Sequence, residues 1–142
     1  MLDKIVNNII ECETLANKIS KNFSPGDVIS LEGELGTGKT TFVKGILKGL
    51  NYKEEVTSPT FTLINEYNAD IKVIHIDFYR EMNIERWLKV GINEYLYSDN
   101  IVIIEWGNLI PALLPKQTVH ITFEHLALNK RRIYSYYENF GN

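Results

Sequence analysis

The chain has 142 residues, of which 44% are hydrophobic and 23% are charged. Such a composition is typical of a single globular domain and excludes a disordered chain. The formal net charge of −3 argues against unaided binding to nucleic acid, which usually needs a basic surface. No apolar stretch approaches the roughly 20 residues that cross a bilayer. Because the N-terminus lacks the features of a signal peptide and the lone Cys12 cannot form an intrachain disulfide, we expect a cytoplasmic location.

The first half of the chain is predicted to alternate between helix and strand. An amphipathic first helix is indicated by apolar residues that recur every three or four positions, namely Ile5, Ile9, Cys12, Ala16 and Ile19. A turn at 24–27 follows, and the run 28–31 then predicts a strand that leads into a glycine-rich loop. Beyond this loop, the apolar face of 38–50 predicts a second helix.

The second half combines buried and half-exposed strands. Strands are expected over 61–66 and 73–77, and a helix around 85–96. The run "IVIIEW" at 101–106 is almost wholly apolar, which is typical of a strand buried on both faces of a parallel sheet. The segments 118–125 and 131–137 predict an antiparallel hairpin. We therefore expect an α/β fold whose mixed sheet has parallel strands at its core, antiparallel strands at an edge, and helices on its faces.

The stretch "LEGELGTGKTTF" carries the strongest functional signal. The pattern G-x-x-x-x-G-K-[ST] is matched by four of its residues, namely Gly33, Gly38, Lys39 and Thr40. Backbone N–H groups of such a glycine loop converge on nucleotide phosphates, aided by the positive end of the following helix. The exposed ammonium of Lys39 is expected to reach the β and γ phosphates, and the Thr40 hydroxyl to ligate Mg²⁺. The pattern predicts a single three-layer, P-loop NTPase-like domain over residues 1–142.

Two acidic residues end apolar strands and qualify as partners of this loop. Asp77 ends "VIHID" and Glu105 ends "IVIIE". Because ligands of open α/β sheets bind at the carboxyl ends of the strands, both acids are expected near the phosphates. Either one could touch Mg²⁺ directly or through water, and either could orient the attacking water. Arg80 could reach a phosphate or brace its own loop, and Trp106 could line the nucleotide pocket.

A hydroxyl-rich segment, "VTSPTFTL", lies between the glycine loop and the first of these acids. A switch that closes on the γ-phosphate is one interpretation of its residues Thr57, Ser58, Pro59 and Thr60. A turn that leads into the next strand is the alternative.

The three histidines give no sign of a metal site. His75 falls inside a strand and is expected to be a core histidine, while His120 and His125 lack the spacing of metal ligands.

Three classes of P-loop protein differ in the motifs that accompany the glycine loop. A GTP switch should carry D-x-x-G after its acid strand and N-K-x-D for guanine, but the chain has "DFYR" and "NKRR". A small-molecule kinase usually has an arginine-rich lid, and only Arg80 and Arg86 lie between the two acids. A small ATPase subunit that acts on a partner assembly fits best, with the kinase as the alternative.

Four motifs together resemble the bacterial TsaE (YjeE) family over nearly the whole chain, namely "GELGTGKTTF", "VTSPTFTL", "HIDFYR" and "EWG". These proteins are P-loop ATPase subunits of the machinery that adds a threonylcarbamoyl group to an adenosine beside the anticodon of certain tRNAs. The resemblance implies ATP and Mg²⁺ as cofactors and docking on the TsaD–TsaB pair. It also implies that hydrolysis serves repeated turnover and that tRNA is reached only through the complex.

The resemblance further implies roles for individual residues. The nucleotide would be held by Gly36, Thr37, Gly38, Lys39, Thr40, Thr41, Trp106 and one of Arg131 or Arg132, with Arg132 as the candidate. Mg²⁺ would be held by Thr40, Glu105 and Asp77, the last either directly or as a nearby catalytic acid or base. The catalytic residues would be Lys39, Asp77 and Glu105.

Overall fold

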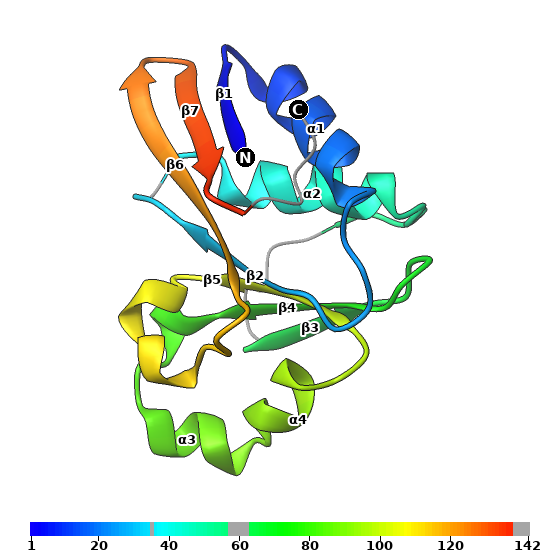
Figure 1. Cartoon of the computed structure of the whole chain (residues 1–142), viewed down its shortest axis with the longest axis vertical. Helices are drawn as coiled ribbons and strands as arrows, with labels where there is room; N and C mark the ends of the chain where they lie inside the picture. The colour runs from blue at the N-terminus through cyan, green and yellow to red at the C-terminus, as the bar shows by residue number, and fades with distance from the viewer. Residues whose placement is uncertain (35, 57–62, 138–142) are drawn as a thin grey trace.

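The computed structural model describes residues 1–34, 36–56 and 63–137. Their strands form a seven-stranded sheet with helices on both faces (Figure 1). In chain order the elements, with η for short 3₁₀ helices, are β1 (Leu2–Val6), α1 (Ile9–Ser20), β2 (Val28–Glu32), α2 (Lys39–Gly49), β3 (Ile64–Tyr67), β4 (Val73–Asp77), η1 (Phe78–Arg80), α3 (Ile84–Lys89), α4 (Ile92–Leu96), β5 (Ile101–Glu105), η2 (Gly107–Leu109), η3 (Pro111–Leu113), β6 (Val119–Ala127) and β7 (Lys130–Ser135). Among the described residues, none of the helices has the length and apolarity that a bilayer span requires.

Parallel strands occupy the centre of the sheet, whose strand order is β1-β7-β6-β2-β5-β4-β3. β2 pairs in parallel with both β5 and β6, and β5 pairs in parallel with β4. Antiparallel pairs form the two edges, with β3 beside β4 at one and β6, β7 and β1 at the other. Every residue of β5 is buried, as expected for a strand covered on both faces. The predicted α/β class and mixed sheet are therefore confirmed.

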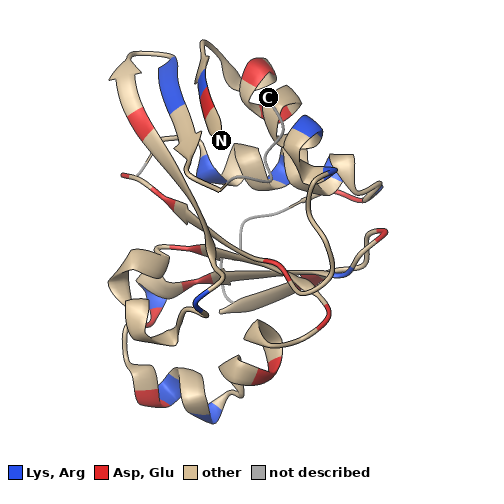
Figure 2. Cartoon of the chain, viewed as in Figure 1, with Lys and Arg blue, Asp and Glu red and all other residues tan. Residues whose placement is uncertain are grey.

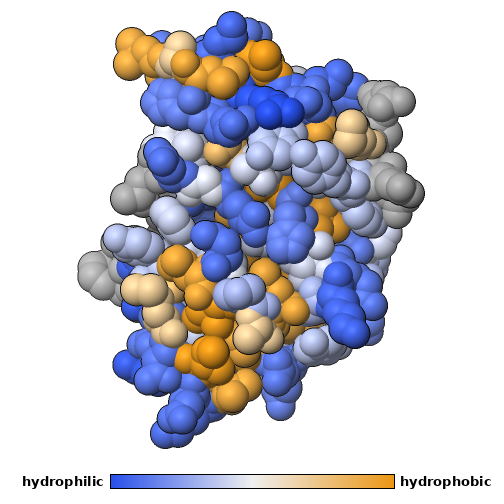
Figure 3. Space-filling view, turned by 60° about the vertical axis from the view of Figure 1, so that its left-hand side comes forward, coloured by the Kyte–Doolittle hydropathy of each residue, from blue (hydrophilic) through white to orange (hydrophobic). Residues whose placement is uncertain are grey.

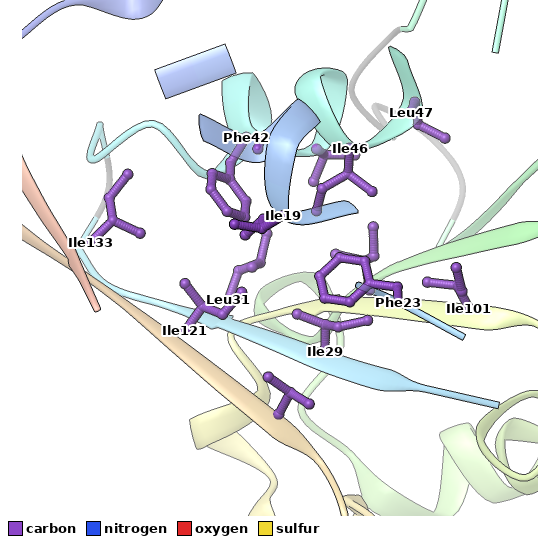
Figure 4. Packing of buried hydrophobic residues seen from close by; sticks show 14 of the residues in the cluster. Ile19, Phe23, Ile29, Leu31, Phe42, Ile46, Leu47, Ile101, Ile121 and Ile133 are labelled. Atoms are coloured by element: carbon purple, nitrogen blue, oxygen red, sulfur yellow. The ribbon is translucent and has the colours of Figure 1, made fainter. Parts of the chain in front are cut away.

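Two apolar clusters attach the helices to opposite faces of the sheet. The larger cluster joins α1 and α2 to one face, and Figure 4 shows Phe42 and Ile46 of α2 directed toward Ile29 and its neighbours on β2. The smaller cluster joins α3 and α4 to the other face around Trp87, which is fully buried. β2 serves both clusters, because successive side chains of a strand point to opposite faces. The sheet is thus the middle layer of three.

Helices α1 and α2 approach each other closely because glycines of α2 face α1. A Cβ added at Gly45 would lie 2.6 Å from the Ala16 Cβ and 2.6 Å from the Glu13 carbonyl oxygen. A Cβ added at Gly49 would lie 2.7 Å from the Asn17 carbonyl oxygen. Since α2 continues directly from the glycine loop, this contact also fixes where the loop lies over the sheet.

The predicted first helix is wrong at its N-terminal end. Residues Leu2–Val6 form β1, an edge strand whose antiparallel partner is β7. Ile5, counted in the predicted helical stripe, is half-exposed on this strand. The helix begins only at Ile9, because the side chain of Asn8 accepts a hydrogen bond from the Glu11 N–H and caps α1.

Two further boundaries differ from the expectation. The helix expected around 85–96 is two short helices, α3 and α4, separated at Gly91, whose φ of +79° is left-handed. The strand expected over 61–66 is represented by β3 from Ile64, while residues 61 and 62 lie outside the described part of the chain. The remaining strands and the second helix are confirmed to within one or two residues.

Gly45→Ala is expected to destabilise the fold although alanine favours helix. Overpacking a core costs about 1–3 kcal/mol, against about 1 kcal/mol gained in helix propensity. Since the added Cβ would approach backbone as well as side chain, we expect the overpacking to prevail, with a net loss of up to about 2 kcal/mol in the free energy of unfolding, measured by urea denaturation. The control is Lys44→Ala at an exposed position of the same helix, which should change stability by less than about 0.5 kcal/mol. A Gly45→Ala protein as stable as the parent would contradict the close α1–α2 contact.

Candidate functional site

A cavity of about 590 Å³ lies where the parallel strands β2, β4 and β5 end. Its walls come from the glycine loop and the start of α2, from the ends of β4 and β5, from the start of α1, and from the β6–β7 turn. Its volume is in the range of small-molecule sites, and its place at the carboxyl ends of parallel strands is the usual ligand position in open α/β sheets.

The backbone of the glycine loop takes conformations that favour glycine. Gly36 and Gly38 have φ values of +77° and +99°. Gly38 is the N-cap of α2, and within the described residues no side chain caps this helix end. The first N–H groups of a helix lack partners inside the helix and carry partial positive charge. The loop therefore ends in an arrangement that can bind an anion such as a phosphate.

Lys39 is buried rather than exposed as the sequence suggested, with 5% of its surface accessible. Its Nζ donates a hydrogen bond of 2.7 Å to the Gly33 carbonyl and lies 3.7 Å from the centroid of the Trp106 ring. Burial lowers the pKa of Lys39, while the nearby charges of Glu105 and Asp77 act in the opposite direction. The ammonium thus lies among a carbonyl, an aromatic ring and two carboxylates.

The two strand-end acids lie side by side. Asp77 and Glu105 are register partners on β4 and β5, so their side chains leave the sheet on the same face. Glu105 is almost wholly buried, and its Oε2 lies 2.6 Å from His75 Nε2. Asp77 Oδ1 accepts a hydrogen bond of 2.9 Å from the Tyr79 N–H, and its Oδ2 lies 3.7 Å from Arg80 Nε. Burial raises the pKa of Asp77, although the hydrogen bond from Tyr79 opposes this effect.

These residues fit a hydrated magnesium ion better than a metal held by protein alone. Nowhere in the described ranges do three or more His, Cys, Asp or Glu side chains cluster as a ready-made metal site. Mg²⁺ in nucleotide sites is usually held by one or two carboxylates, with water and phosphate oxygens as the other ligands. Asp77, Glu105 and the Thr40 hydroxyl, which all line the cavity, supply oxygen donors of this kind.

Trp106 has an unusual backbone conformation. Its φ of +62° and ψ of +30° are left-handed, which is rare for a bulky residue. The indole contacts the Tyr79 ring at 5.2 Å between centroids, in addition to the Lys39 ammonium. Strain of this kind is concentrated at functional sites, and the strained residue, Trp106, directly follows Glu105 in the chain.

The structure favours Arg131 over Arg132 as the arginine of the cavity. Arg131 lines the cavity and its Nη2 donates to the Gly36 carbonyl at 3.1 Å. Arg132 instead forms ion pairs with Asp3 of β1 and Glu124 of β6, at 2.9 and 3.0 Å. Consecutive residues of a strand point to opposite faces, which separates the two guanidinium groups. The candidate nucleotide contact at Arg132 is therefore on the wrong side of β7.

The family model described as "Threonylcarbamoyl adenosine biosynthesis protein TsaE" matches residues 6–133 of the chain. The chain belongs to the TsaE family. It is 39% identical over 115 residues to the tRNA threonylcarbamoyladenosine biosynthesis protein TsaE of Treponema pallidum (strain Nichols), covering 81% of this chain and 85% of that protein. The protein of the same name from Bacillus subtilis (strain 168) is 38% identical over 124 residues, covering 87% and 77%. The crystal structure of Bacillus subtilis YdiB matches with a TM-score of 0.78 and 33% identity, over 93% of this chain and 82% of that one.

Most of the residues singled out in this TsaE-family sequence line one cavity: Gly36, Thr37, Gly38, Lys39, Thr40, Thr41, Asp77, Glu105 and Trp106. The candidate switch residues Thr57, Ser58, Pro59 and Thr60 lie outside the described residues, so the switch stays a prediction. Sequence reasoning missed Asn8 and Asn129 in the cavity wall and the bond between His75 and Glu105. No local signal marks the two asparagines, because their positions depend on how α1 and the β6–β7 turn reach the loop.

Asp77→Asn is expected to stabilise the ligand-free protein near pH 7. Because the pKa of Asp77 is raised above 3.8 in the fold, its ionised form weakens folding at neutral pH, and this penalty disappears as the pH falls through the raised pKa. The asparagine Oδ1 can still accept the Tyr79 N–H bond. Thermal unfolding between pH 7 and 4 should show a higher Tm for the variant at pH 7 and a shrinking gain in acid.

The control for this measurement is Asp99→Asn, which changes an exposed residue. The Tm of this variant should stay close to that of the parent at every pH in the same range. If the gain in Tm from Asp77→Asn stays constant or grows on acidification, the raised pKa of Asp77 is contradicted.

Proposed function

We propose that this TsaE-family chain is an ATPase that binds ATP and Mg²⁺ in the cavity and serves tRNA threonylcarbamoyladenosine biosynthesis. The observation that carries the proposal is the meeting of the glycine loop, the Lys39 ammonium and two strand-end carboxylates in one cavity. The names of the relatives from Treponema pallidum and Bacillus subtilis support the pathway. Those names do not state an energy source, a metal or partner proteins.

In this proposal the triphosphate lies along the glycine loop and the first turn of α2. The N–H groups there and the guanidinium of Arg131 bind phosphate oxygens. A charged phosphate is a stronger acceptor for Lys39 than the neutral Gly33 carbonyl that it bonds in the structure. The indole of Trp106 covers this end of the cavity and keeps water from the ammonium.

The metal site would use the Thr40 hydroxyl and Glu105, with Asp77 either as a further ligand or as a catalytic group beside them. Bound Mg²⁺ supplies positive charge that offsets the negative charge of the phosphates. Glu105 is held by His75, whereas Asp77 has a carboxyl group less engaged by side chains and a raised pKa. This difference supports Glu105 as the metal ligand and Asp77 as the group that orients the attacking water.

We also propose that the chain acts on TsaD and TsaB and contacts tRNA only through their complex. In the view of Figure 2, acidic and basic residues are interspersed, in keeping with the net charge of −3 and unlike a nucleic-acid-binding face.

Exposed apolar side chains are also present on the surface. Figure 3 shows apolar side chains gathered at two places on one face. Ile9, which lines the cavity, and Ile10 beside it are exposed by 67% and 75%. Exposed apolar residues support a protein partner near the cavity, and tRNA modification supports a cytoplasmic location.

ATP hydrolysis is expected to be slow for the chain alone and to rise when TsaD and TsaB are added together. The measurement is phosphate release with Mg·ATP, with complex formation followed on the same samples. The control is Lys39→Ala, which should hydrolyse no ATP above background because the buried ammonium is missing, with folding checked by circular dichroism. A fast rate that the partners leave unchanged, or a phosphorylated small-molecule product, would contradict the proposal and favour a kinase.

Arg131→Ala and Arg132→Ala form a matched pair that tests the arginine assignment. Removing Arg131 takes a guanidinium from the cavity and should weaken ATP binding by about 10- to 100-fold, since a hydrogen bond to a charged group contributes about 1.5–3 kcal/mol. Removing Arg132 breaks only exposed ion pairs and should leave ATP binding within about twofold of the parent. Calorimetric titration with a non-hydrolysable ATP analogue distinguishes them. The opposite ranking would reinstate Arg132 as the nucleotide contact.

A further inference from the structure

His75 is a buried polar residue that lies between apolar residues of β4 and β5 on one side and Asn65, its register partner on β3, on the other. It lies in the middle of β4 with 1% of its surface exposed. Val73 on the same face of β4, and Ile101 and Ile103 on that face of β5, are all fully buried apolar residues. Burying an imidazole beside these apolar side chains costs free energy unless it is hydrogen-bonded, so its presence needs an explanation.

That explanation is the contact between His75 and Glu105. His75 Nε2 lies 2.6 Å from Glu105 Oε2, and both groups are buried. His75 Nδ1 is buried and has no hydrogen-bond partner among the described residues. A neutral ring with its proton on Nε2 donates to the carboxylate and leaves only a lone pair unpaired at Nδ1. A charged ring would instead bury an N–H donor without an acceptor, which costs about 1–3 kcal/mol.

The bond restricts the carboxylate of Glu105. A glutamate side chain has several rotatable bonds, and fixing one oxygen to the rigid β4 strand selects one orientation of the group. With Oε2 engaged by His75, the second carboxylate oxygen, Oε1, is left for the cavity that Glu105 lines. Histidine and carboxylate partners of this kind orient metal ligands in many sites, and their loss typically weakens metal binding.

We propose that His75 is a positioning residue that donates Nε2–H to Glu105 and thereby orients its carboxylate for a divalent cation bound with the nucleotide. The inference rests on the proposed function, because it concerns the metal at the same site. His75 itself contacts neither the nucleotide nor the cation. Its effect should therefore be confined to metal binding, which a purely structural role in the core would not produce.

The test compares His75→Gln with His75→Asn. Both replace the ring by an amide, but only the glutamine nitrogen lies as many bonds from Cβ as histidine Nε2 does. The asparagine nitrogen is one bond too short to reach Glu105. The measurement is the Mg²⁺ concentration that half-saturates binding of a non-hydrolysable ATP analogue, with nucleotide affinity in EDTA measured alongside. We expect His75→Asn to raise that concentration about 10- to 100-fold and His75→Gln to stay within a few-fold of the parent.

Nucleotide affinity in EDTA should be unchanged in both variants. Equal Mg²⁺ dependence in the parent and in both variants would overturn the inference while leaving the proposed function intact. Loss of nucleotide binding in EDTA would also overturn it, since His75 would then support the core. A parent protein that binds no nucleotide with or without Mg²⁺ would overturn the proposed function itself, and this inference with it.

A second measurement does not depend on any variant folding. Nitrogen-15 chemical shifts of the His75 ring in the ligand-free parent report which nitrogen carries the proton. From the geometry of the contact with Glu105, we expect a proton on Nε2. A proton on Nδ1 with a bare Nε2 would overturn the proposed donation to Glu105, whatever the nucleotide titrations show.

Discussion

The burial of one lysine ammonium is the constraint on which the site depends. An ion taken out of water must be compensated by partners, and a single carbonyl is insufficient for a buried cation. Lys39 has the Gly33 carbonyl, the face of Trp106, and the charges of Glu105 and Asp77 around it. These partners come from three segments of the chain, namely the glycine loop, the end of β4 and the end of β5, so the position of the ammonium is set by the whole sheet edge.

The packing of helices on the sheet makes this arrangement possible. Gly45 and Gly49 allow α2 to lie against α1, and the larger apolar cluster packs both helices onto the sheet. The first residues of α2 are thereby held over the ends of β4 and β5, where the acids emerge. A looser contact between the helices would move the loop and its lysine relative to the carboxylates. The rigidity of the layers therefore serves the geometry of the cavity.

The glycine loop, the strand-end acids and the order of elements could be predicted because their signals are local in the sequence. The burial of Lys39 could not, since it depends on the left-handed turn at Trp106, which no nearby residue announces. The His75–Glu105 bond depends on the register of β4 against β5, across 30 positions of sequence. The choice between Arg131 and Arg132 depends on which face of β7 meets the loop. The edge strand β1 was missed because Ile5 happens to continue the spacing of α1.

The placement of the two tryptophans has a practical consequence for following this protein in solution. Trp87 is fully buried in the smaller cluster, on the face of the sheet opposite α1 and α2, whereas Trp106 lines the cavity against a positive charge. Indole emission is sensitive to nearby charge and to solvent. The chain thus carries its own optical reporter: Trp87 contributes a steady background, and changes in intrinsic fluorescence when the cavity is filled would originate at Trp106.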